Sequence, residues 1–146
     1  MTNQQPKIGV GALILRRNHL GEQELLLAQR IGSHGAGNYG SVGGHLEFGE
    51  SPPAALKREA REELGIELGN LEFIACTNFI VEQAHYIDLG FRAEIVAGEP
   101  TIQLAERDKL TNLGWYALND LPGPLFPPLH VYLQAIHSAQ RFFEIV

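Results

Sequence analysis

Three glutamates, Glu59, Glu62 and Glu63, stand at positions i, i+3 and i+4 of a segment with helical character. At about 100° per residue their side chains fall on one face of a helix. Clustered carboxylates offer the oxygen ligands that Mg²⁺ prefers, and they leave room for water and phosphate oxygens. The same residues also fit a solvated acidic face in which Arg58 pairs with Glu62. The triplet alone leaves both interpretations open.

A glycine-rich segment precedes this helix and favours the metal interpretation. Residues 32–44 contain six glycines, which excludes a regular helix and indicates backbone that a ligand can approach closely. Such a loop can place carbonyl groups on a metal ion and N–H groups on phosphate oxygens. We therefore expect a site for a metal and a phosphate where the loop enters the helix.

The segment from Gly44 to Ile66 resembles the Nudix box. The matching residues are Gly44, Glu50, Arg58, Glu59, Ala60, Glu62, Glu63, Gly65 and Ile66. A chance match to the seven fixed positions is on the order of 10⁻⁹ per start point, from background residue usage. The resemblance implies one Nudix domain over residues 1–146, of the α/β (α+β) class. Its expected fold is a three-layer αβα sandwich with a mixed β-sheet.

The resemblance also implies roles for single residues. The expected ligands of a divalent ion, Mg²⁺ or alternatively Mn²⁺, are the Gly43 carbonyl and the carboxylates of Glu59, Glu62, Glu63 and Glu106. Arg58 is expected to orient the glutamates through charge-assisted hydrogen bonds, and Glu50 to be its structural partner. Either Glu59 or Glu63 is expected to act as the catalytic base.

Substrate contacts are expected on the glycine-rich loop and just before it. The candidates are Arg30, Gly44 and His45, with His34 as a second histidine beside the loop. Arg30 suits a phosphate, although a plain surface arginine is an equal alternative. The aromatic residues Phe79, Tyr86, Trp115 and Tyr116 are expected to pack in the core, and stacking of one of them on a base is the alternative.

A wider resemblance, from about Ile8 to about His137, is to the MutT-homologue nucleotide-pool hydrolases. It implies hydrolysis of a nucleoside triphosphate to a nucleoside monophosphate and pyrophosphate. One alternative is a Nudix hydrolase of another nucleoside diphosphate derivative, such as ADP-ribose or a dinucleotide. Another is a Nudix module that binds a nucleotide without cutting it, which the intact set of charged residues argues against.

Composition limits the partners. The net charge of −6 argues against binding of a nucleic-acid polymer, whereas an anionic nucleotide fits if a divalent ion supplies positive charge. A length of 146 residues suits one domain. The only cysteine, Cys76, excludes an internal disulfide, and the apolar run from Val10 to Leu15 is too short to span a bilayer. We expect a cytoplasmic protein without a membrane segment, and the resemblance adds the expectation of a homodimer.

The elements that position these residues follow from the sequence pattern. A helix is predicted from the N-cap Ser51 to the C-cap Gly65, with Pro52 in its first turn. Its core-facing stripe is predicted as Pro53, Leu56, Ala60 and Leu64. Strands are predicted at 7–15 and 24–28, as a hairpin, and at 71–81, 86–96 and 114–117. A last helix is predicted at 129–142, after a proline-rich segment.

Overall fold

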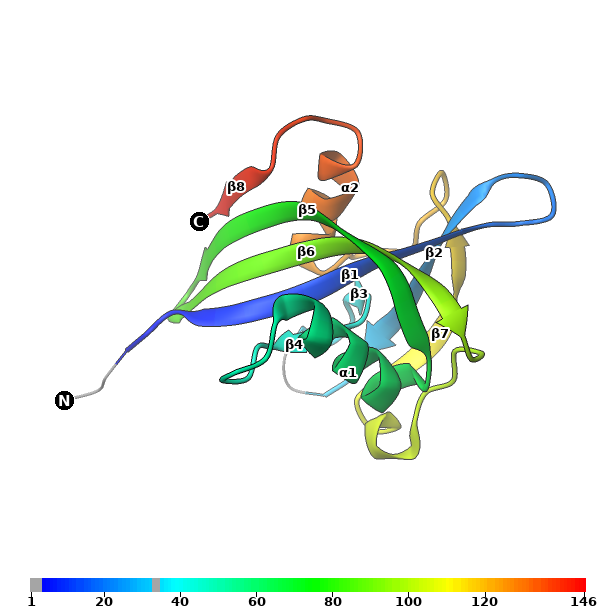
Figure 1. Cartoon of the computed structure of the whole chain (residues 1–146), viewed down its shortest axis with the longest axis horizontal. Helices are drawn as coiled ribbons and strands as arrows, with labels where there is room; N and C mark the ends of the chain where they lie inside the picture. Colours follow the sequence, from blue (N-terminus) through cyan, green and yellow to red (C-terminus); the bar gives the residue numbers. More distant parts are fainter. Residues whose placement is uncertain (1–3, 33–34) are drawn as a thin grey trace.

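A mixed β-sheet forms the centre of the computed structural model, which describes residues 4–32 and 35–146 (Figure 1). The strands are β1 (Lys7–Arg17), β2 (Gln23–Arg30), β3 (Tyr39–Gly40), β4 (Gly43–His45), β5 (Glu67–Val81), β6 (Ala84–Ala97), β7 (Leu110–Ala117) and β8 (Phe142–Ile145). The helices are α1 (Pro52–Leu64), the 3₁₀ turn η1 (Leu104–Glu106) and α2 (Pro127–Ala135). The predicted hairpin, early helix and later strands are therefore present.

The sheet contains both parallel and antiparallel pairs. Its strand order is β3-β2-β1-β6-β5-β8, with β4 added on β1 and β7 on β2. Strand β1 runs antiparallel to β2 and β4 and parallel to β6, so it lies at the middle of the fold. Because β4 pairs only with β1, it forms a short edge beside the glycine-rich segment.

The two helices cover opposite faces of the sheet. On β1, Val10, Ala12 and Ile14 join one buried cluster with the α1 residues Leu56 and Ala60. Leu13 and Leu15 of β1 join a second cluster, which contains most of the buried side chains of α2. Because successive side chains of a strand point to opposite faces, one helix packs on each face. The predicted three-layer αβα sandwich is confirmed.

Helix α1 is fixed by the capping residues that its sequence predicts. The Ser51 hydroxyl accepts a hydrogen bond from the Ala54 N–H at 3.2 Å, and Gly65 ends the helix with a φ of 67°. The buried stripe contains Leu56, Ala60 and Leu64 as predicted, but Ala55 takes the place predicted for Pro53. Pro53 lies in the first turn and stays half-buried.

The prediction of a helix over residues 129–142 is wrong in its second half. Helix α2 ends at Ala135, and residues 142–145 form β8, which pairs in parallel with β5. The Arg141 side chain donates to the carbonyls of Ala135 and Ser138 at 3.3 and 3.0 Å, which satisfies backbone groups at the helix end. Phe143 is then buried against α2, so a contact distant in sequence overrides local helical preference.

No helix in the described ranges is long and apolar enough to cross a membrane.

Candidate active site

The backbone of β4 lies directly against the glutamates of α1. A Cβ atom added at Gly44 would overlap the carboxylate of Glu59. Glycine at this position therefore lets the Glu59 carboxylate rest on the strand backbone. The glycine-rich loop and the acidic helix thus meet where the sequence predicts.

Gly43 turns its polar backbone atoms away from β1. Strand β4 is bonded to β1 on either side of Gly43, through Ala12 N–H to Val42 O at 3.0 Å and Leu46 N–H to Ile8 O at 2.9 Å. This pattern leaves Gly43, opposite Gly11, at a non-hydrogen-bonded position. Its N–H instead donates to Glu63 Oε2 at 3.3 Å, and its carbonyl is free of the β1 ladder.

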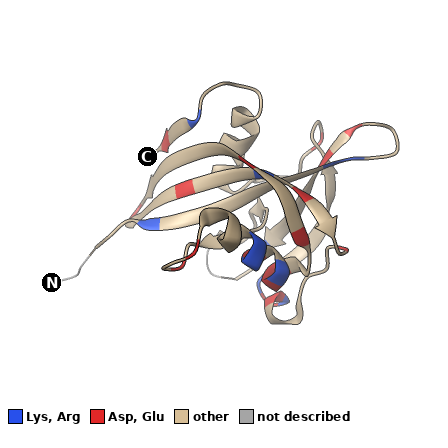
Figure 2. Ribbon diagram, in the orientation of Figure 1, with Lys and Arg blue, Asp and Glu red and all other residues tan. Residues whose placement is uncertain are grey.

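Arg58 organises the carboxylates of Glu50, Glu59 and Glu62. Its guanidinium donates to Glu50 Oε1 at 2.8 Å and to Glu59 Oε1 at 2.9 Å. It also reaches Glu62 at 3.4 Å and the His45 carbonyl at 3.3 Å. The predicted partnership of Arg58 with Glu50 is confirmed. Figure 2 shows acidic and basic positions side by side along α1.

Burial disfavours ionisation of the glutamates near Gly43. Burial, followed by the nearby Glu59 and Glu106 charges, raises the pKa of Glu63 to about 8, although the Gly43 N–H and Arg30 act in the opposite direction. Burial also raises the pKa of Glu59 despite its bond to Arg58. In contrast, the hydrogen bond from Arg58 lowers the pKa of Glu50. Protein groups therefore only partly support the ionisation of both Glu59 and Glu63.

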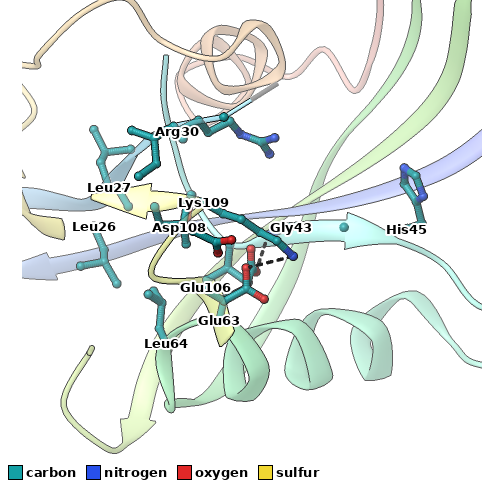
Figure 3. Close-up of a pocket in the computed structure, with 18 residues that line it drawn as sticks. Leu26, Leu27, Arg30, Gly43, His45, Glu63, Leu64, Glu106, Asp108 and Lys109 are labelled. Carbon is teal, nitrogen blue, oxygen red and sulfur yellow. Dashed lines mark hydrogen bonds and ion pairs between the residues drawn. The ribbon is translucent and has the colours of Figure 1, made fainter. Parts of the chain in front are cut away.

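The expected ligands are not all equally close to this centre. Glu106, in η1, lies beside Glu63, with its carboxylate 3.9 Å from Lys109 Nζ (Figure 3). The Glu62 side chain is 57% exposed and engages Arg58. Among the described residues, no three side chains of the His, Cys, Asp or Glu type are arranged as a ready metal site. The structure thus brings Glu59, Glu63 and Glu106 close together, as the sequence predicts, whereas Glu62 lies at the edge of this group.

A cavity of about 510 Å³ opens over the carboxylates of Glu63 and Glu106, whereas Glu59 does not line it. Its walls include Arg30, Gly43, Glu63, Glu106 and Lys109, and Figure 3 shows Arg30 across the cavity from the two glutamates. The Arg30 guanidinium also stacks over the ring of Phe126, with 4.5 Å from Cζ to the ring centroid. Arg30 is therefore held at the mouth of the cavity, whereas His34 lies outside the described residues.

A second cavity, of about 930 Å³, lies on the α2 face and shares Arg30, Gly43, Gly44 and His45 with the first. Phe79, Tyr86 and Phe126 line it. Trp115 and Tyr116 pack against the core clusters as predicted, whereas Phe79 and Tyr86 instead face this cavity. Figure 3 shows His45 apart from the glutamates, and its ring centroid is 5.5 Å from that of Tyr86.

Two residues of the second cavity are missing from the sequence predictions. Asp88 lies half-buried in β6, and its carboxylate accepts a hydrogen bond from the Tyr132 hydroxyl of α2. The signal in the sequence was a carboxylate between Ile87 and Leu89, inside an apolar strand. The partnership with Tyr132 was not visible, because it depends on how α2 docks on the sheet.

Similar proteins carry the same fold. The family model of the NUDIX domain matches residues 5–136. The NAD-capped RNA hydrolase NudC of Pseudomonas aeruginosa is 35% identical over 120 residues, which cover 82% of this chain but 40% of that protein. The NudC protein of Pseudomonas entomophila gives 35% identity over 121 residues and 41% coverage of its length. The chain thus spans about two fifths of these curated relatives.

Solved structures extend the similarity to nearly the whole fold. The MutT NUDIX hydrolase from Burkholderia pseudomallei has a TM-score of 0.81 and 32% identity, covering 91% of this chain and 99% of that one. The NUDIX domain of Shewanella oneidensis NrtR, solved with ADP ribose, has a TM-score of 0.74 at 22% identity. That second likeness concerns the fold alone. With the family model matched over most of its length, the chain belongs to the Nudix hydrolase family.

Proposed function

We propose that this chain hydrolyses the diphosphate linkage of a nucleoside triphosphate, releasing a nucleoside monophosphate and pyrophosphate. The observation that carries the proposal is the junction of two unlike cavities at Gly43 and Gly44. One holds the buried glutamates and Arg30, as a phosphate chain with a divalent ion requires. The other has aromatic walls, as a nucleobase requires.

The distribution of aromatic residues favours one base per substrate. Phe79, Tyr86 and Phe126 all line the cavity on the α2 face. Among the described residues that line the acidic cavity, none is phenylalanine, tyrosine or tryptophan. A triphosphate brings one base and a chain of phosphates, which matches this division, whereas a dinucleotide brings a second ring system.

The residues at the junction fit a divalent cation such as Mg²⁺ or Mn²⁺. Their donors are hard oxygens, from Glu59, Glu63 and Glu106 and from the Gly43 carbonyl that is free of the β1 ladder. Glu59 and Glu63 retain raised pKa values beside one another, which indicates that a further positive charge is needed to ionise both. When bound, the ion supplies positive charge to the phosphate oxygens and offsets the net charge of the protein.

The chain's own residues orient the substrate and accept a proton. Arg30 lies across the cavity from the glutamates and is proposed to hold phosphate oxygens through paired N–H donors. Gly44 and His45 are proposed to contact the nucleoside where the cavities join. A water oxygen forms the new bond to phosphorus, its proton passes to Glu59 or Glu63, and the bridging P–O bond breaks to release pyrophosphate. Arg58 acts as a positioning residue through Glu59.

A second substrate class is favoured by one observation. The curated relatives at 35% identity are named NAD-capped RNA hydrolases, which supports a dinucleotide linkage as the second candidate. Those proteins are more than twice as long as the matched segment. The reaction type is the same in both cases, because a diphosphate linkage is cut, but the products differ.

A product assay tests the proposal. The protein is incubated with Mg²⁺ and, separately, with nucleoside triphosphates, NAD and ADP-ribose, and the products are resolved by chromatography. We expect a monophosphate and pyrophosphate from a triphosphate. Two monophosphates from NAD, with triphosphates intact, would support the second class. Binding without turnover of any of these compounds would contradict both and would identify a nucleotide-binding module.

A further inference from the structure

The cavity on the α2 face has a hollow above Gly9 of β1. A Cβ atom at Gly9 would lie 3.3 Å from Asp88 Oδ1 and 4.0 Å from a ring carbon of Tyr86. Because glycine has no side chain, this space stays open between an acceptor oxygen and an aromatic ring. Both Asp88 and Tyr86 line the cavity, so the hollow is continuous with it.

Asp88 is held in place by Tyr132 of helix α2, which packs on this face of the sheet. The Tyr132 hydroxyl donates to Asp88 Oδ2, and the Tyr132 ring occupies space that a Cβ atom at Gly11 or Gly90 would fill. The second carboxylate oxygen, Oδ1, receives no hydrogen bond from any residue that the structure describes and is the one beside Gly9. Burial raises the pKa of Asp88 to about 6, with Tyr132 acting in the opposite direction, so the group is ionised at neutral pH.

An ionised carboxylate can only accept hydrogen bonds. Oδ1 faces the cavity without a protein donor, so a ligand that supplies a donor there gains a charge-assisted hydrogen bond and with it affinity. A ring oxygen or unprotonated ring nitrogen facing Oδ1 would be repelled. The hollow therefore discriminates by hydrogen-bond character as well as by shape.

We propose that Asp88 is a specificity-determining residue that selects nucleobases carrying an exocyclic amino group, which donates to Asp88 Oδ1 above Gly9. An exocyclic amino group projects beyond the ring edge, so it can reach the floor of the cavity while the ring lies against Tyr86. The inference rests on the proposed function for the identity of the ligand as a nucleotide. It adds the chemical feature of the base that the protein recognises.

A structural role for the Asp88–Tyr132 pair makes a different prediction. If the pair only joined α2 to the sheet, variants would change stability without changing the order in which bases bind. Thr77 offers a matched control, because it lies opposite Asp88 on β5 and its buried hydroxyl has no partner in the described structure. Thr77→Val changes polarity in the same row of side chains but leaves Oδ1 and the hollow intact.

Binding of monophosphates tests the proposal without relying on turnover. Dissociation constants are measured by calorimetry for three pairs that differ in one amino group: GMP and IMP, AMP and purine riboside monophosphate, and CMP and 2-pyrimidinone riboside monophosphate. In the pair that contains the nucleotide with the highest affinity, we expect wild type to bind the member with the amino group about tenfold to hundredfold more tightly than the member without it. Asp88→Asn is expected to bring that ratio close to one, because the amide can place a donor beside Gly9.

Two further variants separate recognition from folding. Gly9→Ala narrows the hollow with a methyl group 3.3 Å from Asp88 Oδ1 and removes no polar or charged group. It is therefore expected to reduce the same ratio even if Asp88→Asn fails to fold. Thr77→Val is expected to preserve it. Equal binding of both members by wild type, or an unchanged ratio in Gly9→Ala, would overturn the proposal. An intact ratio with no hydrolysis of any nucleotide would overturn the proposed function alone.

Discussion

The carboxylate of Glu63 accepts a hydrogen bond from the backbone N–H of Gly43 at 3.3 Å, which joins the last turn of α1 to the edge strand β4. The bond supplies one donor to a buried side chain whose other neighbours include the carboxylates of Glu59 and Glu106. The same strand presents the Gly43 carbonyl away from β1. Several acceptor oxygens therefore lie close together around Gly43, and only some of them receive a hydrogen bond from a protein donor.

Replacing Glu63 with glutamine is expected to separate activity from stability. Glu63→Gln keeps an acceptor for the Gly43 N–H but loses the charge, so hydrolysis is expected to fall at least about a hundredfold. At pH 9, above the Glu63 pKa of about 8, the metal-free variant is expected to unfold at a higher temperature than wild type, because a buried like charge is gone. Nucleotide turnover and thermal unfolding in EDTA provide the two measurements.

The exposed glutamate that follows α1 provides the control for that variant. Glu67 pairs with Arg61 outside both cavities, so Glu67→Gln is expected to keep wild-type turnover. Adding Mg²⁺ is expected to raise the unfolding temperature of wild type and Glu67→Gln but not of Glu63→Gln. Equal stabilisation of all three proteins would place the ion elsewhere.

A methyl group at Gly44 is expected to disrupt the site without removing any charge. The added Cβ atom of Gly44→Ala would overlap the Glu59 carboxylate and push it from the strand backbone. Turnover is expected to fall about tenfold to a hundredfold, since displacement of a reacting group by about 1 Å has effects of this size. Gly114→Ala, where a Cβ atom makes only ordinary contacts, should retain activity. Wild-type rates for Gly44→Ala would refute the packing argument.

Lysine is expected to be a poor substitute for Arg58. The guanidinium bonds Glu50 and Glu59 at once, and an ammonium group cannot reproduce that planar geometry. For Arg58→Lys we expect kcat to fall about tenfold or more with a smaller change in KM, because Glu59 loses its orientation. Arg61→Lys, on the exposed side of the same helix, serves as the comparison in steady-state kinetics. Similar kcat values for the two variants would argue against a positioning role.

The Asp88–Tyr132 pair predicts a pH-dependent difference in stability between wild type and Asp88→Asn. Burial raises the pKa of Asp88 from 3.8 to about 6, so the folded state binds a proton more tightly than the unfolded state. The stabilisation from this proton is fully present below pH 4 and is lost as the pH rises from about 4 to 6, with no further change above pH 6. Over that interval the free energy of unfolding of wild type is expected to fall by about 3 kcal/mol relative to that of Asp88→Asn, from 1.36 kcal/mol per pKa unit. Urea unfolding at several pH values measures the difference, and a flat difference would contradict it.

Local signals in the sequence predict much of the fold. Ser51 and Gly65 define α1 because capping depends on backbone groups within a few residues. The hairpin of β1 and β2 is similarly local. The helix predicted through Phe142 failed because Phe143 pairs with Thr77 of β5, far away in the sequence, and that pairing has no local signal. Non-local contacts thus decide the C-terminal segment.

The residues of the candidate site also fall into those that local sequence predicts and those that depend on tertiary packing. Glu59, Glu63 and Gly43 were predictable, because one helix and the loop preceding it bring them together. The weaker placement of Glu62 follows from its orientation toward solvent, since its side chain is 57% exposed whereas that of Glu59 is 16% exposed. Helical spacing alone does not distinguish the two. Asp88 and Tyr132 meet only after two layers pack, so the base-facing part of the site required the structure.

Binding of Mn²⁺, followed by electron paramagnetic resonance in the presence of a non-hydrolysable nucleoside triphosphate analogue, tests the acidic site most directly. We expect saturable binding to wild type. The dissociation constant for Mn²⁺ is expected to be at least about tenfold larger for Glu59→Gln and Glu63→Gln and unchanged for Glu67→Gln. Identical Mn²⁺ titrations for all four proteins would contradict the central claim that the Glu59 and Glu63 carboxylates beside Gly43 hold the ion.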